Sequence, residues 1–200
     1  AIKHLFKTEK IFFDKEQMGL FIRGLRRTKL DEGETTKMAH ALQFETLKTL
    51  VSQINLSTIK GIRDRAIFLL GYTGAFRISE LLILTVNDIS FDNKGCTVLV
   101  RRSKTDQMGE GKFKIIPFRF DEYCPVAALK NYLIQGSITE GFIFRTVSGR
   151  KSKVKLTDRK LDRYSALVMI KTLAKEFSPH SFRAGFITDC TEQDISDRKI

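Results

Sequence analysis

The chain has 200 residues, 42% of them hydrophobic, and a formal net charge of +12 from 35 Lys and Arg against 23 Asp and Glu. This length suits one domain, or one domain and part of another, with enough apolar side chains for a real core. The positive charge indicates an anionic partner, and nucleic acid is the first candidate because neutralised phosphates release counterions. A membrane is disfavoured, because the sequence has no run of 18 apolar residues, no lipidation signal and no signal peptide at its start.

The three cysteines, Cys96, Cys124 and Cys190, are far apart and fall in no Cys-x-x-Cys or Cys/His metal-ligand spacing. We therefore expect free thiols in a reducing cytoplasm and no metal site.

The first third of the chain predicts two amphipathic helices with a polar linker between them. Apolar positions recur near every 3.6 residues over 14–27 and over 39–54. Residues 28–37 are polar and contain Gly33, which is typical of a linker. We place a domain boundary near Lys37, so that residues 1–37 are the end of a preceding domain and residues 38–200 are the main one.

The rest of the chain predicts further helices and a few short strands. Helices are expected over 62–72, 75–84, from Pro125 onward, over 161–177 and from Ser178-Pro179; strands over 88–91, 96–102, 113–118 and 142–144; and a basic loop over 149–155. This order predicts an α+β fold that is mainly helical, with a small antiparallel sheet inserted, rather than an alternating βαβ fold.

Arg77 and Glu80 follow an apolar helix and the Thr73-Gly74 turn, so both project from a defined corner of the chain. They are three residues apart and share a helical face. The planar fork of arginine matches two phosphate oxygens at once. The alternative is that Arg77 and Glu80 form only a surface salt bridge, and this alternative weighs most for the role of Glu80.

His180 and Arg183 are also three residues apart, at the start of the helix that Ser178 and Pro179 introduce. The backbone N–H groups and the dipole at a helix N-terminus favour an anion. Lys104 follows the strand over 96–102 and precedes Gly109 and Gly111, in a loop that would let it reach a groove. A lysine serves as a general acid when its neighbours tune its pKa.

In order along the chain, these motifs are Thr-Gly-Ala-Phe-Arg-Ile-Ser-Glu-Leu, Arg-Ser-Lys-Thr and Pro-His-Ser-Phe-Arg. Together they resemble the catalytic domain of the tyrosine recombinases, the phage-integrase family, over most of the chain. Arg77 falls on the first arginine of the family box, Glu80 on its acidic neighbour, Lys104 on the β-hairpin lysine, and His180 and Arg183 on the His-x-x-Arg motif. Residues 23–27 and 39–42 resemble the end of the core-binding, DNA-binding domain and the linker that follows it.

The resemblance implies that a tyrosine attacks a DNA phosphodiester, leaving a 3′-phosphotyrosyl enzyme and a free 5′-hydroxyl without ATP, metal or other cofactor. Arg77 and Arg183 would hold the non-bridging oxygens, Lys104 would protonate the leaving oxygen, and His180 would assist proton transfer from the tyrosine. The implied partner is double-stranded DNA, on which the protein would be a homo-oligomer assembled through a segment beyond Ile200.

The chain departs from the family pattern because no tyrosine follows His180. Tyr72, Tyr123, Tyr132 and Tyr164 all lie upstream, and none matches the nucleophile position. We expect that the parent protein continues past Ile200 and begins before Ala1, so that this chain alone does not cleave DNA. Two alternatives stay open: a non-catalytic DNA-binding protein of the same fold, and a type IB topoisomerase.

Basic side chains outside the catalytic set form three groups that we expect to contact DNA. They are Arg23, Arg26, Arg27 and Lys29; Arg101 and Arg102; and Arg150, Lys151 and Lys153. Solvated surface charge is the alternative for each group.

Overall fold

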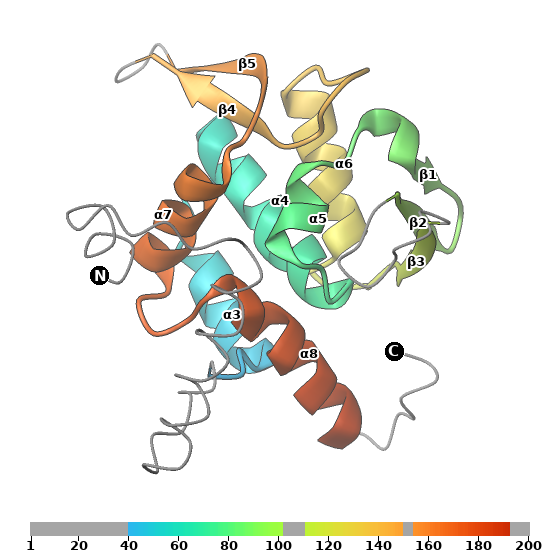
Figure 1. The fold of residues 1–200 in the computed structure, drawn as a ribbon, viewed down its shortest axis with the longest axis vertical. Coiled ribbons are helices and arrows are strands. Elements are labelled where there is room, and N and C mark those ends of the chain that lie inside the picture. Colours follow the sequence, from blue (N-terminus) through green and yellow to red (C-terminus); the bar gives the residue numbers. More distant parts are fainter. Residues whose placement is uncertain (1–39, 102–110, 150–153, 193–200) are drawn as a thin grey trace, which may run out of the picture. The chain divides into compact units, whose positions relative to one another are not determined.

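The computed structural model describes residues 40–101, 111–149 and 154–192 (Figure 1). The helices are α3 (Phe44–Ser52), α4 (Ile59–Thr73), α5 (Ile78–Leu82), α6 (Pro125–Gln135), α7 (Arg163–Leu173) and α8 (Pro179–Glu192), with a 3₁₀ turn η1 (Val86–Asp88). The strands are β1 (Ile89–Phe91), β2 (Gly95–Val100), β3 (Lys112–Pro117), β4 (Arg145–Ser148) and β5 (Lys155–Lys160). The predicted α+β class, mainly helical with small antiparallel sheets, is confirmed.

Helix α4 is the centre of the core, and α3, α6 and α8 pack around it. Most of its residues from Ala66 to Tyr72 are fully buried, which explains why its sequence is apolar on all sides. The helix begins earlier than the predicted residue 62, because the Thr58 hydroxyl accepts a hydrogen bond of 3.1 Å from the Gly61 amide and caps the first turn.

Arg63 and Asp64 form a buried ion pair at the start of α4, and the exposed Lys60 joins it. The Arg63 guanidinium donates to Asp64 Oδ1 at 2.7 Å and to the Arg145 carbonyl at 2.8 Å, and Lys60 donates to Asp64 Oδ2 at 2.9 Å. Because every charge in the cluster has a partner, the cluster ties α4 to β4 without leaving a polar group unpaired.

The strands form two separate antiparallel units. Strands β1, β2 and β3 lie in that order, with Val98 opposite both Ile89 and Lys114, as the predicted hairpin and third strand require. The second unit, β4 paired with β5, was not predicted. The expected strand over 142–144 is wrong: Phe142 makes only an isolated bridge to Thr85, and the regular strand begins at Arg145.

Several helix ends also differ from the predictions. Helix α3 begins at Phe44 instead of residue 39, and α7 occupies Arg163–Leu173 instead of residues 161–177. At α7 the Asp162 carboxylate accepts from the Ser165 amide at 2.9 Å and sets the first turn. The starts of α6 at Pro125 and of α8 at Pro179 are as predicted.

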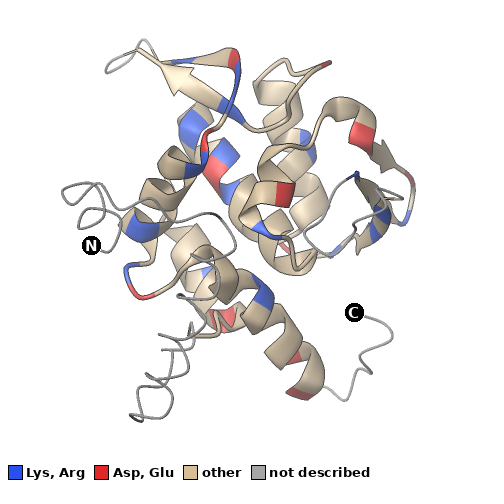
Figure 2. Ribbon diagram, viewed as in Figure 1, with Lys and Arg blue, Asp and Glu red and all other residues tan. Residues whose placement is uncertain are grey.

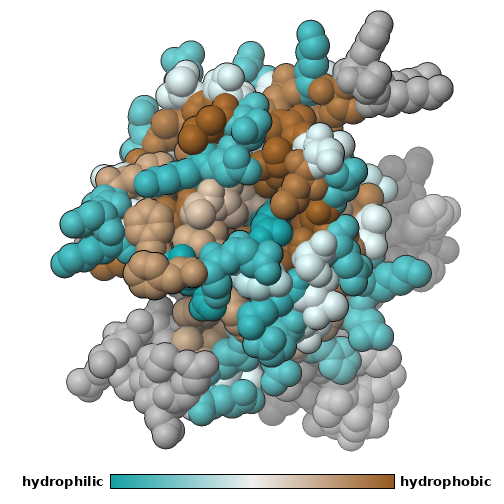
Figure 3. All heavy atoms as spheres, turned by 180° about the vertical axis from the view of Figure 1, so that it is seen from behind, coloured by the Kyte–Doolittle hydropathy of each residue, from teal (hydrophilic) through white to brown (hydrophobic). Residues whose placement is uncertain are grey.

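The predicted helix over 14–27, the linker over 28–37 and the boundary near Lys37 lie outside the described residues, so they stay predictions. None of the described helices combines the length and apolar character needed to cross a bilayer. On the face opposite that of Figure 1, hydrophobic surface gathers in the upper part, and hydrophilic side chains cover much of the lower part (Figure 3).

All three cysteines are buried and unpaired. Burial raises the pKa of the Cys96 thiol to about 11, which keeps this side chain in its unreactive thiol form at neutral pH.

Candidate active site

The turn that precedes α5 sets the backbone position from which the Arg77 side chain extends. The Phe76 amide donates back to the Gly71 carbonyl at 3.0 Å, and Ala75 has a positive φ of 45°, which is uncommon for a residue with a side chain. A Cβ on Gly74 would lie 2.1 Å from the Phe76 ring, so only glycine fits beneath this ring. Arg77 then takes an extended conformation as the residue that caps α5, which is why the helix starts at Ile78 and not at the predicted residue 75.

Glu80 holds Arg77 at two points. Its Oε1 accepts from Arg77 Nη1 at 2.7 Å, and its Oε2 accepts from the Arg77 backbone amide at 3.1 Å. The Glu80 side chain is only 5% exposed, whereas that of Arg77 is 27% exposed. The buried carboxylate therefore orients a guanidinium that keeps access to solvent, which is more than a surface salt bridge does.

Hydrogen bonds and packing contacts hold helix α8 against α3, the residues before α3, and α4. The Leu42 amide donates to the Ser181 carbonyl at 3.0 Å, and the Phe44 amide donates to Asp189 Oδ2 at 2.9 Å. The Tyr72 hydroxyl donates to the same carboxylate oxygen. Phe182 packs edge-on against Phe68 of α4. These contacts fix the position of the N-terminal turn of α8, which carries His180.

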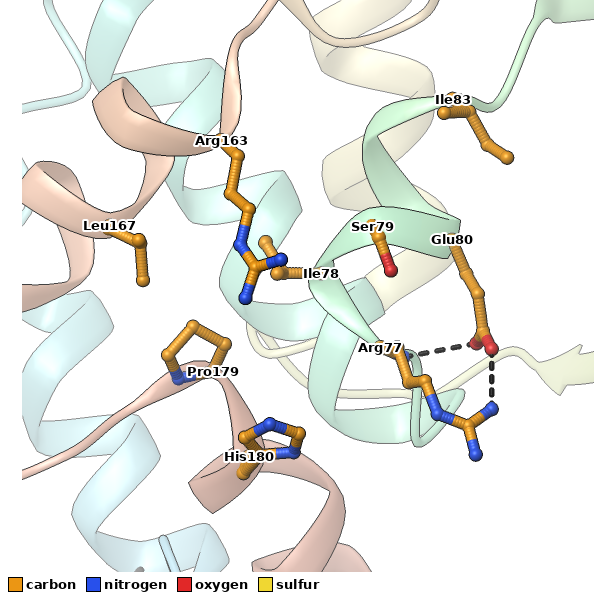
Figure 4. A pocket seen from close by; sticks show the side chains of 9 residues that line it. All are labelled: Arg77, Ile78, Ser79, Glu80, Ile83, Arg163, Leu167, Pro179 and His180. Carbon is orange, nitrogen blue, oxygen red and sulfur yellow. Dashed lines mark hydrogen bonds and ion pairs between the residues drawn. The ribbon is translucent and has the colours of Figure 1, made fainter. Parts of the chain in front are cut away.

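Residues from α5, α7 and α8 line one open pocket of about 440 Å³ (Figure 4). Arg77 and Glu80 lie on one side, Pro179 and His180 at the start of α8 form another wall, and Arg163 extends from α7 toward Ile78. The full lining is Arg77, Ile78, Ser79, Glu80, Ile83, Arg163, Leu167, Pro179 and His180. The fold thus brings together the Arg77–Glu80 and His180 segments, which lie about a hundred residues apart in the sequence.

The other predicted catalytic residues have different positions. Arg183 lies one turn further along α8 and does not line the pocket, although its charge and that of Arg77 both act on Lys114 of β3. Lys104 lies outside the described residues.

Among the predicted DNA contacts, only Arg101 is described, and its Nε donates to the buried Asp88 carboxylate at 2.5 Å. Burial alone would raise the pKa of Asp88, but hydrogen bonds from Thr85 and Arg101 outweigh it and hold the pKa below its usual range. The remaining predicted contacts lie outside the described residues: Arg23, Arg26, Arg27, Lys29, Arg102, Arg150, Lys151 and Lys153. In the described part, Lys and Arg are spread over several elements (Figure 2).

Two basic residues near the site were missed in the sequence. Arg163 lines the pocket, and the Asp162-x-x-Ser165 pattern, which starts a helix, would have placed it on a first turn. Lys114 and Ile116 are two residues apart on β3, so their side chains point to the same face of the strand. Because Ile116 is buried, this periodicity would have placed Lys114 on the inward face.

No upstream tyrosine lines the pocket. Tyr72 is committed to Asp189, and burial together with that carboxylate raises the pKa of its hydroxyl strongly. The Tyr132 hydroxyl is buried and accepts from the Arg145 amide at 3.3 Å. Tyr164 is 76% exposed and lines a different cavity, between α4, β4 and α7. Within the described ranges, no three His, Cys, Asp or Glu side chains come together as a metal-ligand group.

The model of the phage integrase family matches residues 40–200. The chain belongs to the phage integrase family. This confirms the resemblance to tyrosine recombinases drawn from the motifs. An integrase/recombinase xerD homolog of Selenomonas ruminantium is 31% identical over 186 residues, which cover 88% of this chain and 53% of that relative. The chain spans about half the length of the curated relatives it matches.

Solved structures agree on the fold. The crystal structure of XerA recombinase superposes with a TM-score of 0.58 at 21% identity, covering 82% of this chain and 53% of XerA. The XerH site-specific recombinase bound to its difH substrate superposes with a TM-score of 0.55 at 16% identity, covering 82% and 46%. At these identities the likeness establishes the fold alone.

Proposed function

We propose that the chain is part of a site-specific DNA recombinase or integrase that breaks and rejoins DNA through a 3′-phosphotyrosyl intermediate. The observation that carries this function is the pocket in which Arg77, Glu80 and His180 meet from distant segments. Membership of the phage integrase family supports it, as does the DNA-bound state of XerH, a protein of the same fold.

In the proposed reaction, Arg77 and Arg183 bind the non-bridging oxygens of the scissile phosphate as negative charge grows on them. Lys104 protonates the leaving 5′-oxygen, and His180 assists removal of the tyrosine proton. Glu80 keeps the Arg77 guanidinium in position. Arg163 is the second guanidinium that lines the pocket, beside that of Arg77, and it would bind a neighbouring phosphate.

The proposed reaction needs a tyrosine downstream of His180, and the 200 residues contain none there. We propose that the longer protein acts as a homo-oligomer on duplex DNA. A non-catalytic DNA-binding protein of the same fold is the alternative, and the same experiment separates the two.

The test is a nicked suicide substrate that traps a covalent protein–DNA adduct. The 200-residue chain should give no adduct but should bind duplex DNA, with an affinity that falls steeply across a salt series. A protein extended past Ile200 in its reading frame should form the adduct, and Arg77→Ala or Arg183→Ala should abolish it. An extended protein that forms no adduct on its own site would favour the non-catalytic alternative, and an affinity independent of salt would contradict both readings.

A further inference from the structure

Lys114 of β3 meets the turn that carries Arg77 at two points. Its Nζ donates a hydrogen bond of 2.5 Å to the Gly74 carbonyl, and the same ammonium lies over the Phe76 ring, 4.9 Å from the centroid. Strand β3 also approaches this turn through Ile116, since a Cβ on Gly74 would lie 3.0 Å from Ile116 Cδ1. The strand therefore supports the turn from a side of the chain that contributes no residue to the pocket lining.

The turn needs such support. Ala75 has a left-handed backbone conformation, and such conformations persist only when surrounding contacts over-determine them. Glu80 fixes Arg77 from the α5 side, through both its guanidinium and its backbone amide. On the other side of Ala75, the Lys114 ammonium fixes the Gly74 carbonyl.

We propose that Lys114 is a positioning residue, which locks the Gly74–Arg77 turn so that the Arg77 guanidinium is presented to a DNA phosphate. This role rests on the DNA-binding function proposed above. Lys114 acts through Arg77 and is distinct from Lys104, to which the family motif assigns the proton transfer.

The charges around Lys114 make this role sensitive to pH. Burial lowers the pKa of the Lys114 ammonium, and the positive charges of Arg183, Arg77 and Lys112 lower it further, although the Glu80 carboxylate opposes them. As pH rises through this lowered pKa, the ammonium becomes neutral at a pH where an exposed lysine is still charged. Its hydrogen bond to the Gly74 carbonyl then loses its charge-assisted strength.

The first experiment needs no DNA. Amide hydrogen exchange at Phe76, whose N–H closes the turn onto Gly71, is compared in the wild-type chain, Lys114→Met and Lys130→Met. Lys130 is the matched control, because its ammonium lies over two aromatic rings, at 5.0 Å from each centroid, but does not line the pocket. Among the three proteins, we expect only Lys114→Met to show roughly tenfold faster exchange at the Phe76 amide, because only this variant loses the hydrogen bond from the charged Lys114 ammonium. Equal exchange in all three proteins would overturn the proposal.

The second experiment is a double-mutant cycle on affinity for a short DNA duplex. Lys114→Met should weaken binding by the folded protein roughly tenfold, and this effect should vanish in an Arg77→Ala background, because one residue acts through the other. Additive effects would mean that Lys114 contacts phosphate by itself, and would overturn the positioning role. Normal binding by Arg77→Ala would instead count against the proposed function, so the two failures are distinguishable.

The conservative variant Lys114→Arg tests whether the charge of Lys114 matters. Its readout is the pH profile of DNA affinity, which a purely structural role of Lys114 would not change. Lys114→Arg keeps the charge and the donors, so we expect it to restore most of the DNA affinity. Arginine stays charged at all accessible pH values. Wild-type affinity should therefore decline on the alkaline side of neutrality while that of Lys114→Arg stays level. Parallel pH profiles would overturn the role assigned to the ammonium.

Discussion

Replacing Gly185 by alanine has two opposing effects on stability: alanine favours the helix, but its Cβ needs space. The atoms packed around Gly185 determine which effect is larger. Gly185 lies inside α8, two residues after Arg183. In an exposed helix interior this change stabilises by about 1 kcal/mol, because alanine loses less backbone freedom on folding. Here, a Cβ would lie 1.9 Å from the Leu42 carbonyl oxygen, 2.5 Å from its carbon and 2.9 Å from its nitrogen.

These three neighbours are backbone atoms, so no side-chain rotation relieves the clash. Helix α8 would have to move away from residue 42, and the 3.0 Å hydrogen bond from the Leu42 amide to the Ser181 carbonyl would be strained or lost. Overpacking costs about 1–3 kcal/mol and the hydrogen bond about 1 kcal/mol. We therefore expect Gly185→Ala to lower the free energy of unfolding by about 1–3 kcal/mol, after the propensity gain of about 1 kcal/mol is subtracted.

Urea denaturation followed by circular dichroism measures this difference, with Gly71→Ala as the matched control. Gly71 is also a buried glycine inside a helix, but the nearest atom to its added Cβ is Leu81 Cδ2 at 3.5 Å, an ordinary contact. The control should be neutral or more stable by up to about 1 kcal/mol. If Gly185→Ala proves as stable as the wild type, the close approach of α8 to residue 42 is wrong, and so is the position of His180 at the start of that helix.

Three further changes test other parts of the site. Glu80→Gln should lower the free energy of unfolding by about 1–2 kcal/mol, because Arg77 loses charge-assisted hydrogen bonds; unchanged stability in urea would show that the carboxylate does not hold the turn. The lowered pKa of Asp88 means that its carboxylate stabilises the fold above the unfolded pKa of about 4, and that this contribution is lost as pH falls through the folded-state pKa. Asp88→Asn should therefore be less stable than the wild type at neutral pH, by a margin that shrinks in acid; a margin independent of pH would refute the ionic role. Arg163→Ala should weaken DNA binding and reduce the slope of log affinity against log salt by about one unit, whereas Lys171→Ala, at an exposed position of the same helix, should leave the slope unchanged; equal slopes in both variants would remove Arg163 from the DNA surface.

Local signals in the sequence were enough for much of the fold. Proline at a first helical position marked the starts of α6 and α8, because it lacks an N–H that would be unpaired there in any case. Alternating β-branched residues around a Gly-containing turn marked β1 and β2. The family motifs, taken in order, also singled out Arg77, Glu80 and His180, and the fold brings these three side chains to one pocket.

What the sequence could not supply depends on contacts between distant residues. The β4–β5 pair was missed because a strand of mostly exposed, charged residues such as Lys155–Lys160 has little hydrophobic alternation, and its partner alone makes it a strand. Helix α5 is short because its start is set by hydrogen bonds from Arg77 and Phe76, not by propensity.

The class of the fold and the family follow from local patterns and motifs, and so do the residue types that the motifs single out, Arg77, Glu80 and His180. By contrast, contacts between distant segments place Arg163 at the pocket and bring Lys114 within hydrogen-bond distance of the Gly74 carbonyl. Periodicity tells which face of an element is buried, but not which other element that face will meet.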